Sequence, residues 1–310
     1  MILHQFPNLQ WLKAQAASQF ADRQGVGGIK LMKPGWPTVV LNTRASAVVR
    51  DNIQGPLSIF TNLSGSSEVK VDKKRVSVSS DNFFISNAGQ NYSLELSGKS
   101  TTETFNIHFG EDFSQNAIPN ILTSKKDILE NPELKEGFGF YNRIIPIDET
   151  FKKIVNAIRE CGNDTLLLEV QLFELLKLIL LKEKNVKEAR ERFPSIKSST
   201  KTEILRRLLT STDYLYTYYD KNPGLDELAA ISCFSKFHFL RLFKIAYEQT
   251  PHQFIIALKI KKAAELLQRT NDDVRAIADA VGFENSSSFS RTFYKEMGYY
   301  PSHYREMVKG

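Results

Sequence analysis

The chain has 310 residues, of which 42% are hydrophobic, and this is enough for two domains that each bury a core. Lysine and arginine exceed aspartate and glutamate by six, and this excess divides equally between residues 1–199 and 200–310. Such a mild positive charge suits a polyanionic partner but does not by itself identify a nucleic-acid binder. The two cysteines, Cys161 and Cys233, show neither metal nor redox spacing.

The beginning of the chain has no basic segment followed by an apolar run, which a signal peptide would have. The most apolar stretch, Leu166 to Leu181, has sixteen residues and is interrupted by three charged residues. It is too short and too charged to span a bilayer. We therefore expect a cytoplasmic protein without a membrane partner.

The first third of the chain has the texture of a β domain. The N-terminal residues that could line a short amphipathic arm are Phe6, Leu9, Trp11 and Leu12. From Ile29 to Phe113, short alternating apolar runs are separated by glycine, serine, asparagine and aspartate, which is typical of an antiparallel sandwich or barrel. Within it, Val69 to Val78 predicts a hairpin that turns at Lys73-Lys74. We assign residues 1–115 to this domain.

Residues 116–199 predict a helical segment that ends in a linker. Helices are expected near 119–134 and at 146–160, where proline and acidic residues precede an apolar face. The strongest seam follows, with apolar residues spaced by four, three and four: Leu168, Leu172, Leu175 and Ile179. Two interpretations are open, since this helix either is buried in its own domain or forms a contact between two copies of the chain. The charged and serine-rich residues 182–199 predict a linker.

Residues 200–310 predict an all-α domain. Thr200 and Glu203 match a capping box, so we expect a helix to begin there. Helix-turn-helix patterns follow at 225–244 and 274–295, with a long helix between them at 251–268. A helix-turn-helix places its second helix in a major groove, and a rigid connector could hold two such helices about one DNA turn, roughly 34 Å, apart.

The two helix-turn-helix patterns are copies of each other, because Arg241 aligns with Arg291 and Phe243 with Phe293 at an offset of fifty residues. Before the second helices the offset is forty-nine, so the second turn contains one extra residue. The outward-facing positions are Lys236, Phe237, Leu240, Arg241 and Lys244 in the first copy and Ser286, Ser287, Ser290 and Arg291 in the second. Arginine can pair with guanine, lysine can contact phosphate, and serine can read either base type.

The segment from Ala276 to Arg305, AIADAVGFENSSSFSRTFYKEMGYYPSHYR, resembles the signature of the AraC/XylS family of bacterial transcription regulators. The resemblance covers about Thr200 to Gly310. It implies a sequence-specific DNA-binding transcription regulator, activator or repressor, that has promoter DNA and RNA polymerase as partners. It also implies groove contacts by Phe237, Leu240 and Arg241 in the first copy and by Ser286, Ser287, Ser290 and Arg291 in the second.

The sequence departs from the family pattern at two positions. Glu248 stands where the first copy usually has the glycine that matches Gly298, and Lys259 stands where the connector usually has an arginine. A positive φ would strain glutamate at position 248, so we expect the loop after the first recognition helix to be built differently.

The N-terminal part is similar to the cupin-like sensory domains that many members of this family carry. We therefore expect an α+β multidomain protein: a cupin-like antiparallel β sandwich or barrel, a helical middle segment and a C-terminal all-α domain. The resemblance implies a small-molecule effector and a homodimer, and we expect no cofactor. Residues that could line an effector pocket, or could be ordinary core, are Phe60, Phe83, Phe84, Tyr92, Phe105 and His108.

Two other classes of protein remain as alternatives. A cupin enzyme fused to a DNA-binding domain would need several converging metal ligands, and residues 1–199 contain only two histidines, His4 and His108. A protein-interaction scaffold could use the paired helix-turn-helix patterns without binding DNA.

Overall fold

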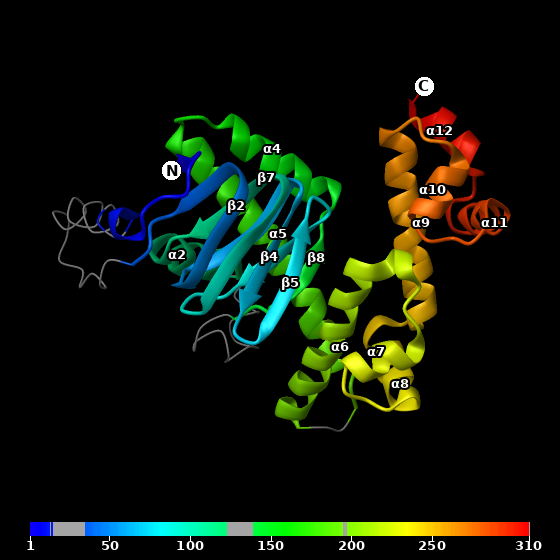
Figure 1. Cartoon of the computed structure of the whole chain (residues 1–310). Helices are drawn as coiled ribbons and strands as arrows, with labels where there is room; N and C mark the ends of the chain where they lie inside the picture. Colours follow the sequence, from blue (N-terminus) through cyan, green and yellow to red (C-terminus); the bar gives the residue numbers. More distant parts are fainter. Residues whose placement is uncertain (13, 15–34, 123–138, 195–196, 310) are drawn as a thin grey trace. The chain divides into compact units, whose positions relative to one another are not determined.

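The computed structural model describes residues 1–12, 14, 35–122, 139–194 and 197–309. The chain forms two compact units, Met1–Asn185 and Val186–Gly310. The first combines a β-sheet with helices and the second is helical, which confirms the predicted α+β multidomain class (Figure 1). In the described segments no helix is both long and apolar enough to cross a membrane.

The strands of the first unit form one sheet that curls into a nearly closed barrel (Figure 1). They are β1 (Ile2–Leu3), β2 (Val39–Gln54), β3 (Leu57–Ser64), β4 (Ser66–Val71), β5 (Lys74–Ser79), β6 (Asn82–Ser86), β7 (Asn91–Phe109) and β8 (Ile144–Pro146). The sheet curls because β7 is long enough to pair with β4 near its start and with β3 near its end. The predicted hairpin is present as β4 and β5, with its turn at Asp72-Lys73, one residue earlier than expected.

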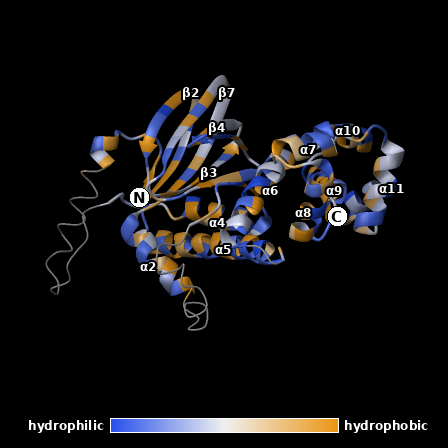
Figure 2. Cartoon of the chain, turned by 90° about the horizontal axis from the view of Figure 1, so that it is seen from below, coloured by the Kyte–Doolittle hydropathy of each residue, from blue (hydrophilic) through white to orange (hydrophobic). Residues whose placement is uncertain are grey.

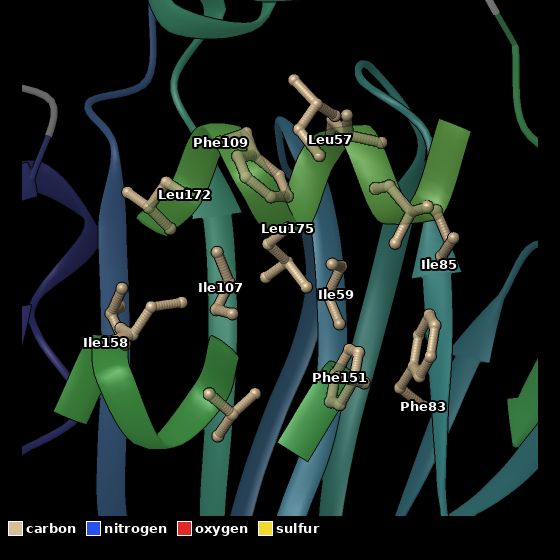
Figure 3. Close-up of a cluster of buried hydrophobic side chains, with 14 of the residues drawn as sticks. Leu57, Ile59, Phe83, Ile85, Ile107, Phe109, Phe151, Ile158, Leu172 and Leu175 are labelled. Carbon is tan, nitrogen blue, oxygen red and sulfur yellow. The ribbon is translucent and has the colours of Figure 1, made fainter. Parts of the chain in front are cut away.

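Side chains along the long strands alternate between two environments, and Figure 2 shows this as alternating polar and apolar residues on β2 and β7. One face of the sheet, which includes Ile59, Phe83 and Ile107, packs against helices α4 (Glu149–Glu160) and α5 (Thr165–Glu191) (Figure 3). The rings of Phe83 and Phe151 are stacked with centroids 4.4 Å apart. The helices and the sheet therefore share one core.

The apolar seam of α5 lies in this core. Leu172 and Leu175 point toward the sheet in Figure 3, and the four seam residues that we considered for a dimer contact are all buried: Leu168, Leu172, Leu175 and Ile179. The interpretation of these four as a contact between copies is therefore wrong, because the chain's own sheet covers them. The apolar residues of α5 that remain exposed are Leu166, Leu167, Val170 and Leu181.

The helical middle segment differs from the sequence prediction at both of its ends. Residues 144–146 pair with β6 as strand β8, so α4 begins only after Asp148, whose carboxylate accepts a hydrogen bond from the Phe151 amide at 2.9 Å. At the other end α5 continues to Glu191 through residues that we predicted as linker, because lysine, glutamate, arginine and alanine favour helix. An earlier helix, α2, spans Glu111–Leu122, and residues 123–134 of the predicted helix lie outside the described residues.

The second unit is a succession of helices. They are α6 (Ser198–Tyr218), the 3-10 turn η2 (Tyr219–Lys221), α7 (Leu225–Ile231), α8 (Lys236–Tyr247), α9 (Pro251–Arg269), α10 (Val274–Ala280), α11 (Ser286–Met297) and α12 (Pro301–Lys309). The capping box predicted at Thr200 is absent, since α6 begins at Ser198 without a side-chain cap. Glu203 instead bonds to Arg206 and Arg207, in each case at 2.8 Å.

Candidate nucleic-acid interface

The first helix-turn-helix consists of α7 and α8. Helix α8 buries Phe239, Leu242 and Phe243, whose spacing of three and one places them on one face. The turn before it is closed by a hydrogen bond from the Phe234 amide to the Ala229 carbonyl at 2.9 Å. Cys233 takes a left-handed conformation in this turn, with φ of 54°. The face of α8 opposite the buried residues is left open to solvent.

The second helix-turn-helix, α10 and α11, is built in the same way. Helix α11 buries Phe289 and Phe293, and its N-cap Asn285 accepts a hydrogen bond from the Ser288 amide at 2.7 Å. A bond from Phe283 to Ala278 at 2.9 Å repeats the turn closure of the first copy. Here Gly282 takes the left-handed conformation, with φ of 76°. The turn has one residue more than the first, as the change of offset predicted.

Helices α8 and α11 also end alike. Glu248 follows α8 with φ of 59° and Gly298 follows α11 with φ of 78°. The amide of each donates to the carbonyl four residues earlier, to Lys244 at 2.9 Å and to Tyr294 at 2.8 Å. The expectation of a different loop after α8 is therefore wrong: glutamate adopts the conformation that glycine adopts in the second copy, at a cost in backbone strain.

The exposed stripe of α8 contains the positions that the sequence proposed for reading DNA. Phe237 is 83% exposed, more than any other large apolar side chain in the described chain. Leu240 is half-buried, and Arg241 and Lys244 are exposed. These four residues follow each other at spacings of three, one and three, which places them in one row along the helix.

The equivalent stripe of α11 contains Ser287 and Arg291, which are exposed, and Ser286 and Ser290, which are half-buried. One member of this row is absent from the positions predicted from the sequence. At the offset of fifty residues, Lys244 corresponds to Tyr294, which is 48% exposed and stacks on Tyr300 with ring centroids 4.7 Å apart. The repeat alone could have identified Tyr294 as the fourth residue of the second stripe.

The lysine and arginine side chains on the two stripes differ in whether they form an ion pair within the chain. Lys236 forms an ion pair with Asp226 of α7 at 2.7 Å. Arg241, Lys244 and Arg291 form neither an ion pair nor a side-chain hydrogen bond with any residue that the structure describes. Their charges are therefore available to an anionic partner, whereas that of Lys236 is partly neutralised.

The six residues proposed for an effector pocket separate onto the two faces of the sheet. Phe83 and Phe105 belong to the core under α4 and α5, so they do not face the barrel interior. Phe84 lies opposite Phe60 in the sheet register. Three of the six line a cavity of about 20 Å³ inside the barrel: Phe60, Tyr92 and His108.

This cavity is small. A volume of about 20 Å³ has room for about one water molecule. Phe6, Leu9 and Leu12 from the N-terminal arm form part of its wall, and Arg50 donates to the Pro7 carbonyl of the arm at 2.9 Å. The arm is therefore part of the cavity wall and is bonded to β2.

Burial determines the ionisation of the polar groups in the cavity wall. Desolvation lowers the pKa of His108 to about 4, so its ring is neutral near pH 7. Its Nδ1 lies 2.9 Å from the Ser58 hydroxyl. Desolvation raises the pKa of Tyr92 to about 12, which keeps its hydroxyl protonated. The Nδ2 atom of Asn106, another wall residue, is buried without a hydrogen-bond partner among the described residues.

Comparison with known proteins gives a family match that lies within the second unit. Residues 228–307 match a family described as a helix-turn-helix domain. The chain is 42% identical to the MmsAB operon regulatory protein of Pseudomonas aeruginosa over 96 residues, which is 31% of each chain. It is 34% identical over 85 residues to RclR of Escherichia coli, an RCS-specific HTH-type transcriptional activator, which is 27% of this chain and 30% of that one.

A solved structure, the DNA-binding domain of AdpA in complex with a target DNA, is 22% identical at a TM-score of 0.32. That match covers 33% of this chain and 93% of the AdpA chain. The matches to the two curated relatives span only about a third of the length of those proteins.

The left-handed glutamate leads to a prediction about stability. Changing Glu248 to glycine should raise the free energy of unfolding by about 0.5–1 kcal/mol, because glycine adopts a positive φ without steric strain. Its exposed ion pair with Arg192, at 3.6 Å, contributes little that would be lost. Urea unfolding of the full chain followed by circular dichroism measures the change.

The matched control is the same substitution at Glu188, which is exposed inside α5. Glycine there should lower the free energy of unfolding by about 0.5–1 kcal/mol. Destabilisation by both substitutions would contradict the assignment of strain to Glu248.

Proposed function

We propose that this chain, whose residues 228–307 form a helix-turn-helix domain of the AraC/XylS type, is a sequence-specific DNA-binding transcription regulator. Helices α8 and α11 would read two successive major grooves. The observation that carries the proposal is the pair of equivalent exposed stripes, each with an arginine that the described chain leaves unpaired. The sequence identity to bacterial regulators supports it.

The residues of the two stripes would have different tasks. Arg241 and Arg291 can each form two parallel hydrogen bonds to a guanine, which is the commonest specific contact in the major groove. Phe237, exposed and apolar, suits the methyl group of thymine. Lys244 and Tyr294, at the ends of their stripes, suit phosphate oxygens, which position the protein without reading sequence. The first reader would thus supply more specificity and affinity than the serine-rich second.

The first unit would bind a small-molecule effector in the barrel interior. The cavity beside Phe60, Tyr92 and His108 supports this, and the unpartnered Asn106 amide offers a donor to a polar group of the ligand. Since the cavity holds about one water, an effector would have to displace the N-terminal arm from the wall.

A homodimer is the assembly that we propose, with the exposed face of α5 as its contact. Leu166 is 72% exposed and Val170 is 50% exposed, and their spacing of four residues places them on one face of the helix. Apolar side chains grouped in this way are favoured where a partner covers them.

We further propose RNA polymerase as a partner at the promoter, a cytoplasmic location and no enzymatic activity. The scaffold alternative predicts no DNA binding.

The proposed reading helices can be tested by selecting duplexes from a random pool with the wild-type chain and measuring binding to them. Changing Arg241 or Arg291 to alanine should cost about 1–3 kcal/mol of binding free energy and relax the preference at one or two base positions. Changing Lys244 to alanine should weaken all duplexes alike and reduce the salt dependence by about one phosphate contact.

The control for charge removal is Lys73→Ala, which changes an exposed lysine of the β4–β5 turn and should leave binding unchanged. If the wild type enriches no duplex, the result favours the protein-interaction scaffold over a DNA-binding protein. If both arginine variants keep the wild-type preference, α8 and α11 are not the readers.

The effector site predicts a difference in thermal stability between two proteins. A compound that binds the barrel interior should raise the melting temperature of the wild type. It should have little effect on Leu94→Phe, because the added bulk fills the cavity that Leu94 lines. Equal shifts in the two proteins would place the compound elsewhere.

The dimer contact predicts an effect on mass in solution. Val170→Glu should convert a dimer into a monomer in sedimentation experiments, since a charge would then be buried in the contact. Val49→Glu, an equivalent change at an exposed position of β2, should leave the dimer intact. A dimer that persists in the Val170 variant would rule out this face.

A further inference from the structure

Lys259 is a buried cation that the proposed reading of DNA does not use. It lies in the middle of α9 and is 2% exposed. Burying an ammonium group is costly unless it is hydrogen-bonded, and the cost appears as a pKa that desolvation lowers from its ordinary value. The contacts of Lys259 must therefore compensate for the free-energy cost of burying its ammonium group.

The ammonium group of Lys259 bonds to two parts of the chain at once. It donates to the Gly282 carbonyl at 2.6 Å and to the Oδ1 atom of Asn222. The Nδ2 atom of Asn222 donates to the same Gly282 carbonyl at 3.0 Å. The ammonium also lies 5.2 Å from the centre of the Phe283 ring. We refer to Asn222, Lys259 and Gly282 as the lysine node.

The members of the lysine node come from the three parts that determine how the two readers are arranged. Asn222 precedes α7 and so leads into the first helix-turn-helix. Lys259 belongs to the connecting helix α9, and Gly282 is the turn of the second helix-turn-helix. The segment that leads into the first motif lies close to the turn of the second at this point, because a Cβ on Gly282 would lie 2.1 Å from the carbonyl oxygen of Asp220 in η2.

Other contacts hold each motif to α9 separately. The second motif buries Phe289 and Phe293 against α9 residues such as Ile260 and Leu267. This packing determines which face of α11 points inward, but apolar contacts are not directional, so it constrains the angle between the two motifs less closely. Hydrogen bonds do have preferred directions, and the lysine node supplies them between the two motifs.

From this arrangement we propose that Lys259 is a positioning residue that fixes the separation and relative angle of α8 and α11. The node would thereby determine which spacing between two groups of base pairs the chain accepts. The inference rests on the proposed function. Inserting one base pair between the two groups rotates one against the other by about 35°, since B-DNA has about 10–10.5 base pairs per turn. Readers held by the node could not follow that rotation, whereas readers released from it could.

The experiment measures the affinity of the full chain for duplexes of different spacing. A duplex enriched from a random pool by the wild type is compared with derivatives that have one base pair inserted or deleted between the two contacted groups. The quantity of interest is the ratio of the dissociation constants for altered and original spacing. For the wild type we expect about 100-fold, equivalent to losing two base contacts.

Lys259→Met keeps the length of the side chain but removes all three donors, and should reduce this ratio to below about 10-fold. Lys259→Arg keeps the charge and the hydrogen-bond donors, so its ratio should be close to that of the wild type. The matched control is Lys262→Met, on the same helix, because Lys262 pairs with Glu265 within one turn at 3.3 Å. It should keep the wild-type ratio.

A second variant addresses the same node if Lys259→Met fails to fold. Asn222→Gly removes the amide but tolerates the left-handed conformation of this residue, where φ is 53°. It should also lower the ratio, and circular dichroism identifies the folded variants.

The inference is overturned if folded Lys259→Met and Asn222→Gly bind all spacings more weakly by a common factor, because the node would then contribute stability alone. If the wild type enriches no duplex, the proposed function and this inference both fail. Enrichment by the wild type with an unchanged ratio in the variants contradicts only the inference.

Discussion

The surface proposed to read DNA depends on the burial of paired aromatic rings. Phe239 and Phe243 in α8, and Phe289 and Phe293 in α11, are separated by four residues and lie on one face of their helix. Because these large rings are buried, the orientation of each helix about its axis is fixed. The opposite stripe, with Arg241 in one copy and Arg291 in the other, must then face solvent. Losing an aromatic ring from this core would cost about 3–5 kcal/mol, so the reading surface and the fold cannot be separated.

The first unit obeys a comparable constraint, which is the alternation of side chains along a strand. Ile59 and Phe60 are neighbours in β3, yet Ile59 packs under the helices and Phe60 lines the interior cavity. One sheet thus contributes to a core on one side and to the interior cavity on the other. Helix α5 covers the first side with its apolar seam, which explains why that seam is not available to a second copy.

The sequence was sufficient for features that depend on local pattern. The two helix-turn-helix motifs, the extra residue in the second turn and the strands of the barrel all follow from spacing and turn residues. Features that depend on distant residues were not predictable. The seam of α5 indicates that something covers Leu172, but not whether that is a sheet of the same chain or a second copy. Alternation puts Phe83 and Phe84 on opposite faces of the sheet, but the pattern could not tell which of the two faces the helices cover. The bonds of Lys259 likewise join residues that are far apart in sequence.

The central claim is that α8 and α11 read two neighbouring major grooves from one side of the duplex. Dimethyl sulfate protection tests it directly, because the reagent methylates guanine N7, which lies in the major groove. With the full chain on a selected duplex we predict two protected groups of guanines whose centres are about 10 base pairs apart. Protection confined to a single groove, or two groups separated by half a turn, would contradict the account.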